Sequence, residues 1–169
     1  MKRVIQIILL LVLLGAGAWL WRSIFPSDEA RIVKLLGGLA ESATFPAGEG
    51  NIGLVRRIDR LTSSLTPDIS VRMTPLGGRA MEISGRDEVM QAAMAARGAA
   101  TSIKVEFLDI KVQSVDSAAG AAEAVLTAKI QAGTDHDFGV QPLKINLRKD
   151  KDFGWRISRI ESTRILNPE

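Results

Sequence analysis

The 169-residue sequence contains no cysteine, no tyrosine and only one histidine, His136. Without cysteine the chain can form neither disulfides nor thiolate metal sites, and it has no cysteine nucleophile. A single histidine is too few for most histidine-based metal centres and acid–base pairs. His136 lies between two aspartates, which would suit a proton donor or pH sensor, but the composition around it favours a solvated hairpin tip. We therefore predict no metal ion and no cofactor, and we identify no catalytic residue.

The excess of positive charge is small and confined to one end of the chain. There are 22 Lys and Arg against 19 Asp and Glu, for a formal net charge of +3. Lys2, Arg3 and Arg22 flank an apolar run, and the rest of the chain has as many basic as acidic residues. A nucleic-acid-binding domain needs clustered positive charge to neutralise phosphates. Nucleic acid is therefore not an expected partner.

The apolar run from Val4 to Trp21 has 18 residues, among which Gln6 is the only polar side chain. As a helix it would be about 27 Å long, close to the thickness of the hydrocarbon core of a bilayer. Aromatic side chains at its end are typical of a membrane interface. The sequence thus predicts a transmembrane anchor that contacts the bilayer through residues 4–25. Its predicted interface residues are Lys2, Arg3, Trp19, Trp21 and Arg22.

Two basic residues, Lys2 and Arg3, precede the run and, by the positive-inside rule, place the N-terminus in the cytoplasm. The alternative is a cleaved signal peptide, because a charged start, an apolar core and the small residues Ala16–Ala18 are typical of one. The run continues beyond these residues to Trp21, which favours an uncleaved anchor. With an uncleaved anchor or with a cleaved signal peptide, the chain after the apolar run is exported. We expect a single-pass protein of the bacterial inner membrane, with an anchor region (1–26) and an outer domain (27–169).

Three helices are predicted in the outer domain. Ser27 caps the first of them. The second carries apolar residues at helical spacing and ends at Thr66, because a residue before proline (here Pro67) disfavours the helical conformation. Ser84 caps the third, which ends before Gly98.

Alternating apolar residues predict six strands. The first two form a hairpin over 69–73 and 79–84, and the others cover 103–112, 124–130, 140–147 and 153–160. The apolar positions shift phase by one residue between Phe107 and Leu108, which predicts a bulge or bend there. The sequence thus predicts an α+β fold in which three helices wrap a bent, mostly antiparallel sheet of about six strands.

The order of these elements resembles the nuclear transport factor 2-like superfamily, which includes SnoaL-like polyketide cyclases and ketosteroid isomerase. The segments Leu65–Val71, Ile83–Val89 and Trp155–Ile160 carry the resemblance, which extends over residues 28–166. It implies a cone-shaped, cystatin-like fold whose interior can hold a small apolar ligand. These motifs are structural, so the resemblance concerns the fold and not an activity.

An enzyme of the isomerase type would need a carboxylate on the apolar concave face and a donor such as tyrosine opposite it. The chain has no tyrosine, and Glu106 and Asp109 alternate with apolar neighbours that place them on the outer face. The acid–base residues of the enzymatic members therefore have no counterpart at any position.

The polar face of the second helix carries a basic strip of Arg56, Arg57 and Arg60. Such a strip suits anionic headgroups near a membrane, or simply a solvated surface. Asp59 lies among these arginines, which favours a surface ion pair over a general base.

Several flexible or aromatic side chains are candidates for a pocket. Thioethers suit a hydrophobic guest, although ordinary filling of the core is the alternative. The candidate lining residues are Met73, Met81, Met94, Phe107 and Trp155.

We therefore expect a membrane-anchored, non-enzymatic interaction or scaffold module that works through a protein partner or as a homo-oligomer. The alternative is binding of a small hydrophobic ligand or lipid in the cone interior, and an isomerase or cyclase comes third. A continuous apolar cavity lined by Met73, Met94, Phe107 and Trp155 would favour the alternative, and a solid, fully packed interior would exclude it.

Overall fold

The computed structural model describes residues 26–74, 80–133 and 138–163. The predicted anchor, its interface residues and His136 lie outside these ranges. Within the ranges, no helix is both long enough and apolar enough to cross a membrane.

The described residues form three helices and six strands. The helices are α2 (Asp28–Ala43), α3 (Asn51–Ser63) and α4 (Arg86–Ala99). The strands are β1 (Leu65–Met73), β2 (Met81–Ser84), β3 (Ile103–Asp116), β4 (Ala121–Ala132), β5 (Phe138–Asp150) and β6 (Gly154–Ser162). They form one sheet in the order β2-β1-β6-β5-β4-β3, and only β1 and β6 pair in parallel. The predicted α+β class and numbers of elements are confirmed, with a mixed sheet.

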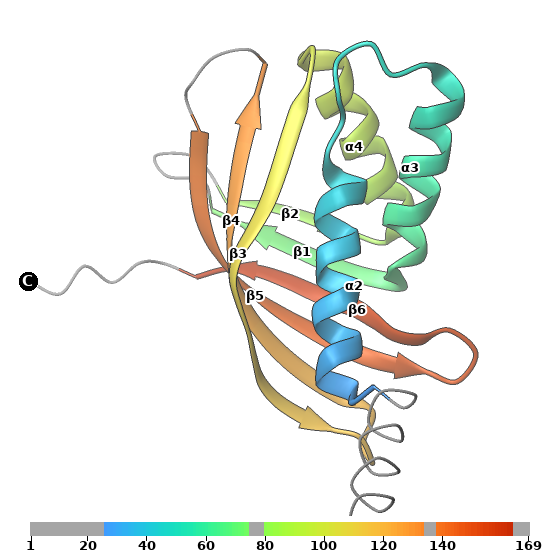
Figure 1. Ribbon diagram of the computed structural model, residues 1–169, viewed down its shortest axis with the longest axis vertical. Coiled ribbons are helices and arrows are strands. Elements are labelled where there is room, and N and C mark those ends of the chain that lie inside the picture. The colour runs from blue at the N-terminus through green and yellow to red at the C-terminus, as the bar shows by residue number, and fades with distance from the viewer. Residues whose placement is uncertain (1–25, 75–79, 134–137, 164–169) are drawn as a thin grey trace, which may run out of the picture.

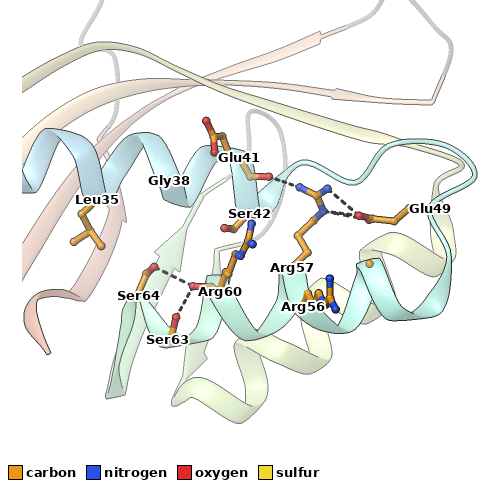
Figure 2. A pocket seen from close by; sticks show the side chains of 11 residues that line it. Leu35, Gly38, Glu41, Ser42, Glu49, Arg56, Arg57, Arg60, Ser63 and Ser64 are labelled. Atoms are coloured by element: carbon orange, nitrogen blue, oxygen red, sulfur yellow. Dashed lines mark hydrogen bonds and ion pairs between the residues drawn. The ribbon is translucent and has the colours of Figure 1, made fainter.

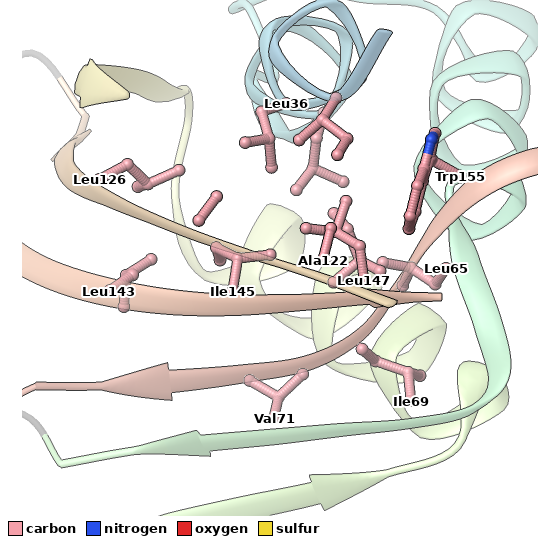
Figure 3. Packing of buried hydrophobic residues seen from close by; sticks show 14 of the residues in the cluster. Leu36, Leu65, Ile69, Val71, Ala122, Leu126, Leu143, Ile145, Leu147 and Trp155 are labelled. Carbon is pink, nitrogen blue, oxygen red and sulfur yellow. The ribbon is translucent and has the colours of Figure 1, made fainter. Parts of the chain in front are cut away.

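The long strands curve around α2, and α3 and α4 lie together at one end of that helix (Figure 1). Ser27 caps α2 as predicted, with its hydroxyl accepting a hydrogen bond of 3.3 Å from the Ala30 amide. Ile32 and Leu36, one turn apart, are both 0 % exposed and belong to the core cluster with the inner residues of β4, β5 and β6. Figure 3 shows Leu36 above these strands. Burying each such side chain is worth about 1.5–3 kcal/mol, so α2 and the sheet hold each other in place.

Strand β3 has its predicted irregularity, because its register with β4 shifts between Leu108 and Lys111. Asp109 adopts a left-handed φ of 53°, which is uncommon for a residue other than glycine. Phe107 and Ile110 pack against the core on either side of the bulge. The sequence pattern predicted that Leu108 would share a face with Ile110. Leu108 instead remains 45 % exposed.

The end of α3 differs from the prediction. The helix stops at Ser63, and Thr66, predicted as its last residue, already belongs to β1. The pairing of β1 with β6 shifts between Leu65 and Ser70, and β2 pairs only from Ser70 onward. Pro67 falls in this interruption, where the missing N–H costs no ladder hydrogen bond.

The ends of α4 also differ from the prediction. Its cap is Gly85 and not Ser84, because φ at this position is 86°, a conformation that glycine adopts without strain. The Ser84 amide instead donates to the Glu88 carboxylate at 2.9 Å. Gly98 does not end the helix, which continues to Ala99 with open space beside the glycine.

Asp28 ties the start of α2 to the far ends of the strands. Its carboxylate accepts hydrogen bonds from the Ser117 hydroxyl at 2.7 Å and from Lys149 Nζ at 3.0 Å, and its side chain is 15 % exposed. The hydrogen bond from Ser117, followed by that from Lys149, lowers the pKa of Asp28 from 3.8 to about 2. The N-terminal dipole of the helix favours the same ionised form.

We expect Asp28→Asn to lower the free energy of unfolding by about 1–2 kcal/mol at neutral pH. The pKa is depressed in the folded state, so this stabilisation is fully present above the unfolded pKa near 4 and disappears as the pH falls through about 2. Urea unfolding at pH 7 and pH 2 should therefore give a clear difference from wild type only at pH 7. Glu29→Gln, in the same turn but exposed, is the control and should lower stability by no more than about 0.5 kcal/mol, its share of the dipole interaction. Equal stability of Asp28→Asn and wild type at pH 7 would contradict this role.

Candidate functional site

An apolar groove of about 590 Å³ lies between α4, the C-terminal end of α2 and the neighbouring ends of β3 and β4. Its volume is within the range of about 300–1,000 Å³ that is typical of small-molecule sites. Every lining side chain is apolar: Ala43, Phe45, Leu61, Val89, Ala92, Ala93, Ala96, Ala99, Ala100, Ile103, Val105, Ile130 and Ala132.

The groove exists because α4 is held at the hairpin and α3, away from β3 and β4. The helix packs on α3, β1 and β2, and it contains no buried residue. Arg86, its first residue, donates a hydrogen bond to the carbonyl of Leu65 at the start of β1. The side of α4 that faces β3 and β4 consists largely of alanines, which are too short to fill the intervening space.

The opposite wall is fixed by hydrogen bonds between the end of α2 and the start of β3. Phe45 and Ile103 exchange two backbone hydrogen bonds of 2.7 and 2.8 Å. The Thr44 hydroxyl accepts from the Val105 amide at 3.0 Å and donates to the Ala40 carbonyl at 3.0 Å. This wall is therefore preformed, which lowers the cost of ordering it around a ligand.

Some apolar side chains of the groove remain accessible to solvent. Ile130, on β4, is 36 % exposed, and Ala96, on α4, is exposed as well. Solvent-accessible apolar surface in a concave site is the surface that a hydrophobic ligand would remove from water.

The groove contains no group for acid–base catalysis, since none of its lining residues is ionisable. Glu106 follows the lining residue Val105 but belongs to a surface ion pair, 2.8 Å from Lys104. The hydrogen bond from Lys104 lowers the pKa of Glu106, which keeps it ionised and unsuited to proton donation near neutral pH. Asp109 is exposed. Across residues 26–74, 80–133 and 138–163, no three potential metal ligands come together.

The five residues predicted to line a pocket do not gather around this groove. Met73 and Phe107 are partly buried against the core, and Trp155 is buried within it (Figure 3). Met81 and Met94 are 47 % and 52 % exposed. The groove is instead lined by small residues, and its sequence signal was the alanine-rich stretch 92–100.

The sequence matches no protein-family model and no curated protein. The structure, in contrast, is similar to solved structures. One is an NTF2-like protein with a cystatin-like fold from Novosphingobium aromaticivorans, with a TM-score of 0.63 and 16% identity over 92% of this chain and 90% of that chain. Another, from the same organism, is a provisionally assigned aromatic ring hydroxylase (TM-score 0.63, 13% identity, 83% and 90% covered). A provisionally assigned dehydratase of the NTF2-like family from Streptomyces avermitilis gives 0.56 at 17% identity, with 83% and 97% covered.

At such identities the likeness establishes the fold alone. The chain therefore has the NTF2-like, cystatin-like fold that its sequence predicted. The names of these neighbours include enzymes, but the site residues of this chain have to be judged by their own chemistry.

Proposed function

We propose that this protein is a membrane-anchored, non-enzymatic module that binds a small hydrophobic ligand, such as a fatty acid, in the apolar groove. The groove itself carries this proposal, because all 13 of its lining residues are apolar and none is ionisable. An apolar groove with one preformed wall favours ligand binding over the scaffold function that the sequence placed first. The provisionally named hydroxylase and dehydratase neighbours do not favour an enzyme here, since the groove lacks a general acid or base.

Burial of an alkyl chain would supply the binding energy. Removing ~300 Å² of apolar surface from water contributes about 7 kcal/mol to the binding free energy, before the cost of association is subtracted. We therefore expect a dissociation constant no lower than roughly 10 μM. A carboxylate or other polar end of the ligand would stay in solvent at the mouth, because no side chain in the lining can pair with it.

The proposed location rests on the predicted anchor at residues 4–25, which would hold the domain on the outer side of the inner membrane. Helix α2 has 16 residues and so extends about 24 Å. The groove lies at its C-terminal end, far along the helix from Asp28, where the anchor region would join. We therefore expect the groove to take its ligand from the aqueous side.

Protein contact is the second candidate function, and the outer face of the sheet supports it. Leu108, Phe138 and Val140 are exposed there, on the face opposite to α2. Exposed apolar side chains on one face of a sheet can contribute to a protein interface.

The proposal is tested with the full chain in lipid nanodiscs and radiolabelled decanoate. Because decanoate also partitions into lipid, uptake is compared with that of empty nanodiscs at equal lipid content. We expect an additional saturable component of about one ligand per chain, as one groove of this size holds one acyl chain. Uptake identical to that of empty nanodiscs would refute the proposal.

A further inference from the structure

A second groove, of about 450 Å³, lies between α2 and α3 and is polar. The three arginines of α3, Arg56, Arg57 and Arg60, all line it (Figure 2). Its carboxylates are Glu41 and Glu49, so its lining has one more positive than negative charge. The arginines differ in what surrounds them, and that difference determines what the groove can bind.

Arg57 has a structural role. Its guanidinium donates to the Glu49 carboxylate, with Nη2 at 2.8 Å and Nε at 3.1 Å, and its Nη1 donates to the Glu41 carbonyl at 2.7 Å. The hydrogen bond from Arg57 lowers the pKa of Glu49, so the pair stays ionised at neutral pH. Gly53 makes room for this pair, since a Cβ there would lie 2.9 Å from the Glu49 side chain. Arg57 is thereby neutralised and connects α3 to the end of α2.

Arg56 and Arg60 are not neutralised in this way. Both are exposed, and within the described part of the chain no carboxylate oxygen lies within 4.0 Å of either guanidinium. The surface ion pair predicted for Asp59 is not formed, since no basic nitrogen of the described residues lies within 4.0 Å of its carboxylate. Two like charges four residues apart on a helix repel each other by a few tenths of a kcal/mol unless an anion lies between them.

The chemistry of the groove suits an oxyanion. Arg60 extends across the groove toward Ser42 on α2, while Arg56 lies one turn back on the same helix (Figure 2). Each guanidinium presents several N–H donors in a planar fork, which matches the oxygens of a phosphate better than it matches a spherical ion. The hydroxyls of Ser63 and Ser64 donate to the Arg60 carbonyl at 2.9 and 3.0 Å, so these two donors are already engaged.

We propose that the groove between α2 and α3 binds a phosphate group through Arg56 and Arg60. Free inorganic phosphate and the phosphodiester of a lipid headgroup share this chemistry. The site is separate from the apolar groove, so it can exist whether or not a hydrophobic ligand binds there.

The test is isothermal titration of the full chain in dodecyl maltoside, a detergent without phosphate. One arm uses inorganic phosphate, and the other uses glycerophosphoglycerol, a soluble headgroup without acyl chains. We expect saturable binding in at least one arm, weakened about tenfold or more in R56Q/R60Q. Tighter binding of glycerophosphoglycerol would identify a lipid headgroup as the source, and tighter binding of phosphate would identify the free ion.

Two further variants separate a specific site from charge and folding effects. R72Q/R159Q removes the same charge from arginines outside the groove, and we expect its affinity to stay within about twofold of wild type. R56K/R60K keeps the charge but loses the planar forks, so an intermediate loss of affinity is expected. The absence of saturable binding in both arms would overturn the proposal. So would R56Q/R60Q binding as tightly as wild type.

Discussion

Replacing Ala96 by tryptophan is expected to weaken saturable decanoate binding by about tenfold or more, because a bulky side chain would occupy the volume that the ligand needs. Ala96 lines the apolar groove and is solvent-exposed, so the indole can extend into the groove without displacing core atoms. The loss should appear in the nanodisc assay as disappearance of the component above empty nanodiscs. Thermal unfolding should remain close to that of wild type.

Ala119→Trp is the matched control for this prediction. Ala119 is also exposed, but it lies in the turn between β3 and β4 and does not line the groove. This variant should bind decanoate as wild type does, because it adds the same indole at a different place. If Ala96→Trp bound as well as Ala119→Trp, the ligand would have to occupy another site.

Leu36→Ala is expected to destabilise the protein by about 3 kcal/mol, within the usual range of 2–5 kcal/mol for a buried leucine. Leu36 is 0 % exposed and packs between α2 and the sheet (Figure 3). The substitution removes three carbon atoms from a closed core and leaves a cavity. The change should be visible as a lower midpoint of urea unfolding with an unchanged slope.

Val33→Ala, on the same helix, is the control for the loss of a branched side chain. Val33 is 43 % exposed, so its truncation should cost no more than about 0.5 kcal/mol. Similar losses for Leu36→Ala and Val33→Ala would mean that α2 does not pack on the sheet through the Leu36 side.

Features that depend on local patterning were predictable from the sequence. The cap at Ser27 follows from a hydroxyl before two acidic residues, and the irregularity of β3 follows from the phase change at Phe107. The parallel pairing of β1 with β6 was not predictable in this way, because it joins residues about 90 positions apart. The error at Thr66 has the same origin, since Pro67 fits within β1 only because the pairing with β6 is interrupted between Leu65 and Ser70.

The apolar groove was missed for a different reason. The sequence pattern pointed to large or flexible side chains, such as Met94 and Trp155, as pocket lining. A cavity instead forms where side chains are small and the backbone elements are held apart, and here alanines such as Ala93 and Ala96 border it. Whether an alanine-rich helix lies against a sheet or away from it depends on tertiary contacts, which for α4 include the hydrogen bond of Arg86.

The central claim is that a hydrophobic ligand enters the groove of the folded protein, and methyl NMR of the full chain in nanodiscs tests it most directly. During a decanoate titration, we predict chemical-shift changes for the methyl groups of Ile103, Val105 and Ile130, which line the groove. The methyl groups of Ile145 and Ile157, buried in the core outside the groove lining, should stay unchanged. Shifts that spare the three groove residues, or that appear only on the outer face of the sheet, would contradict the claim.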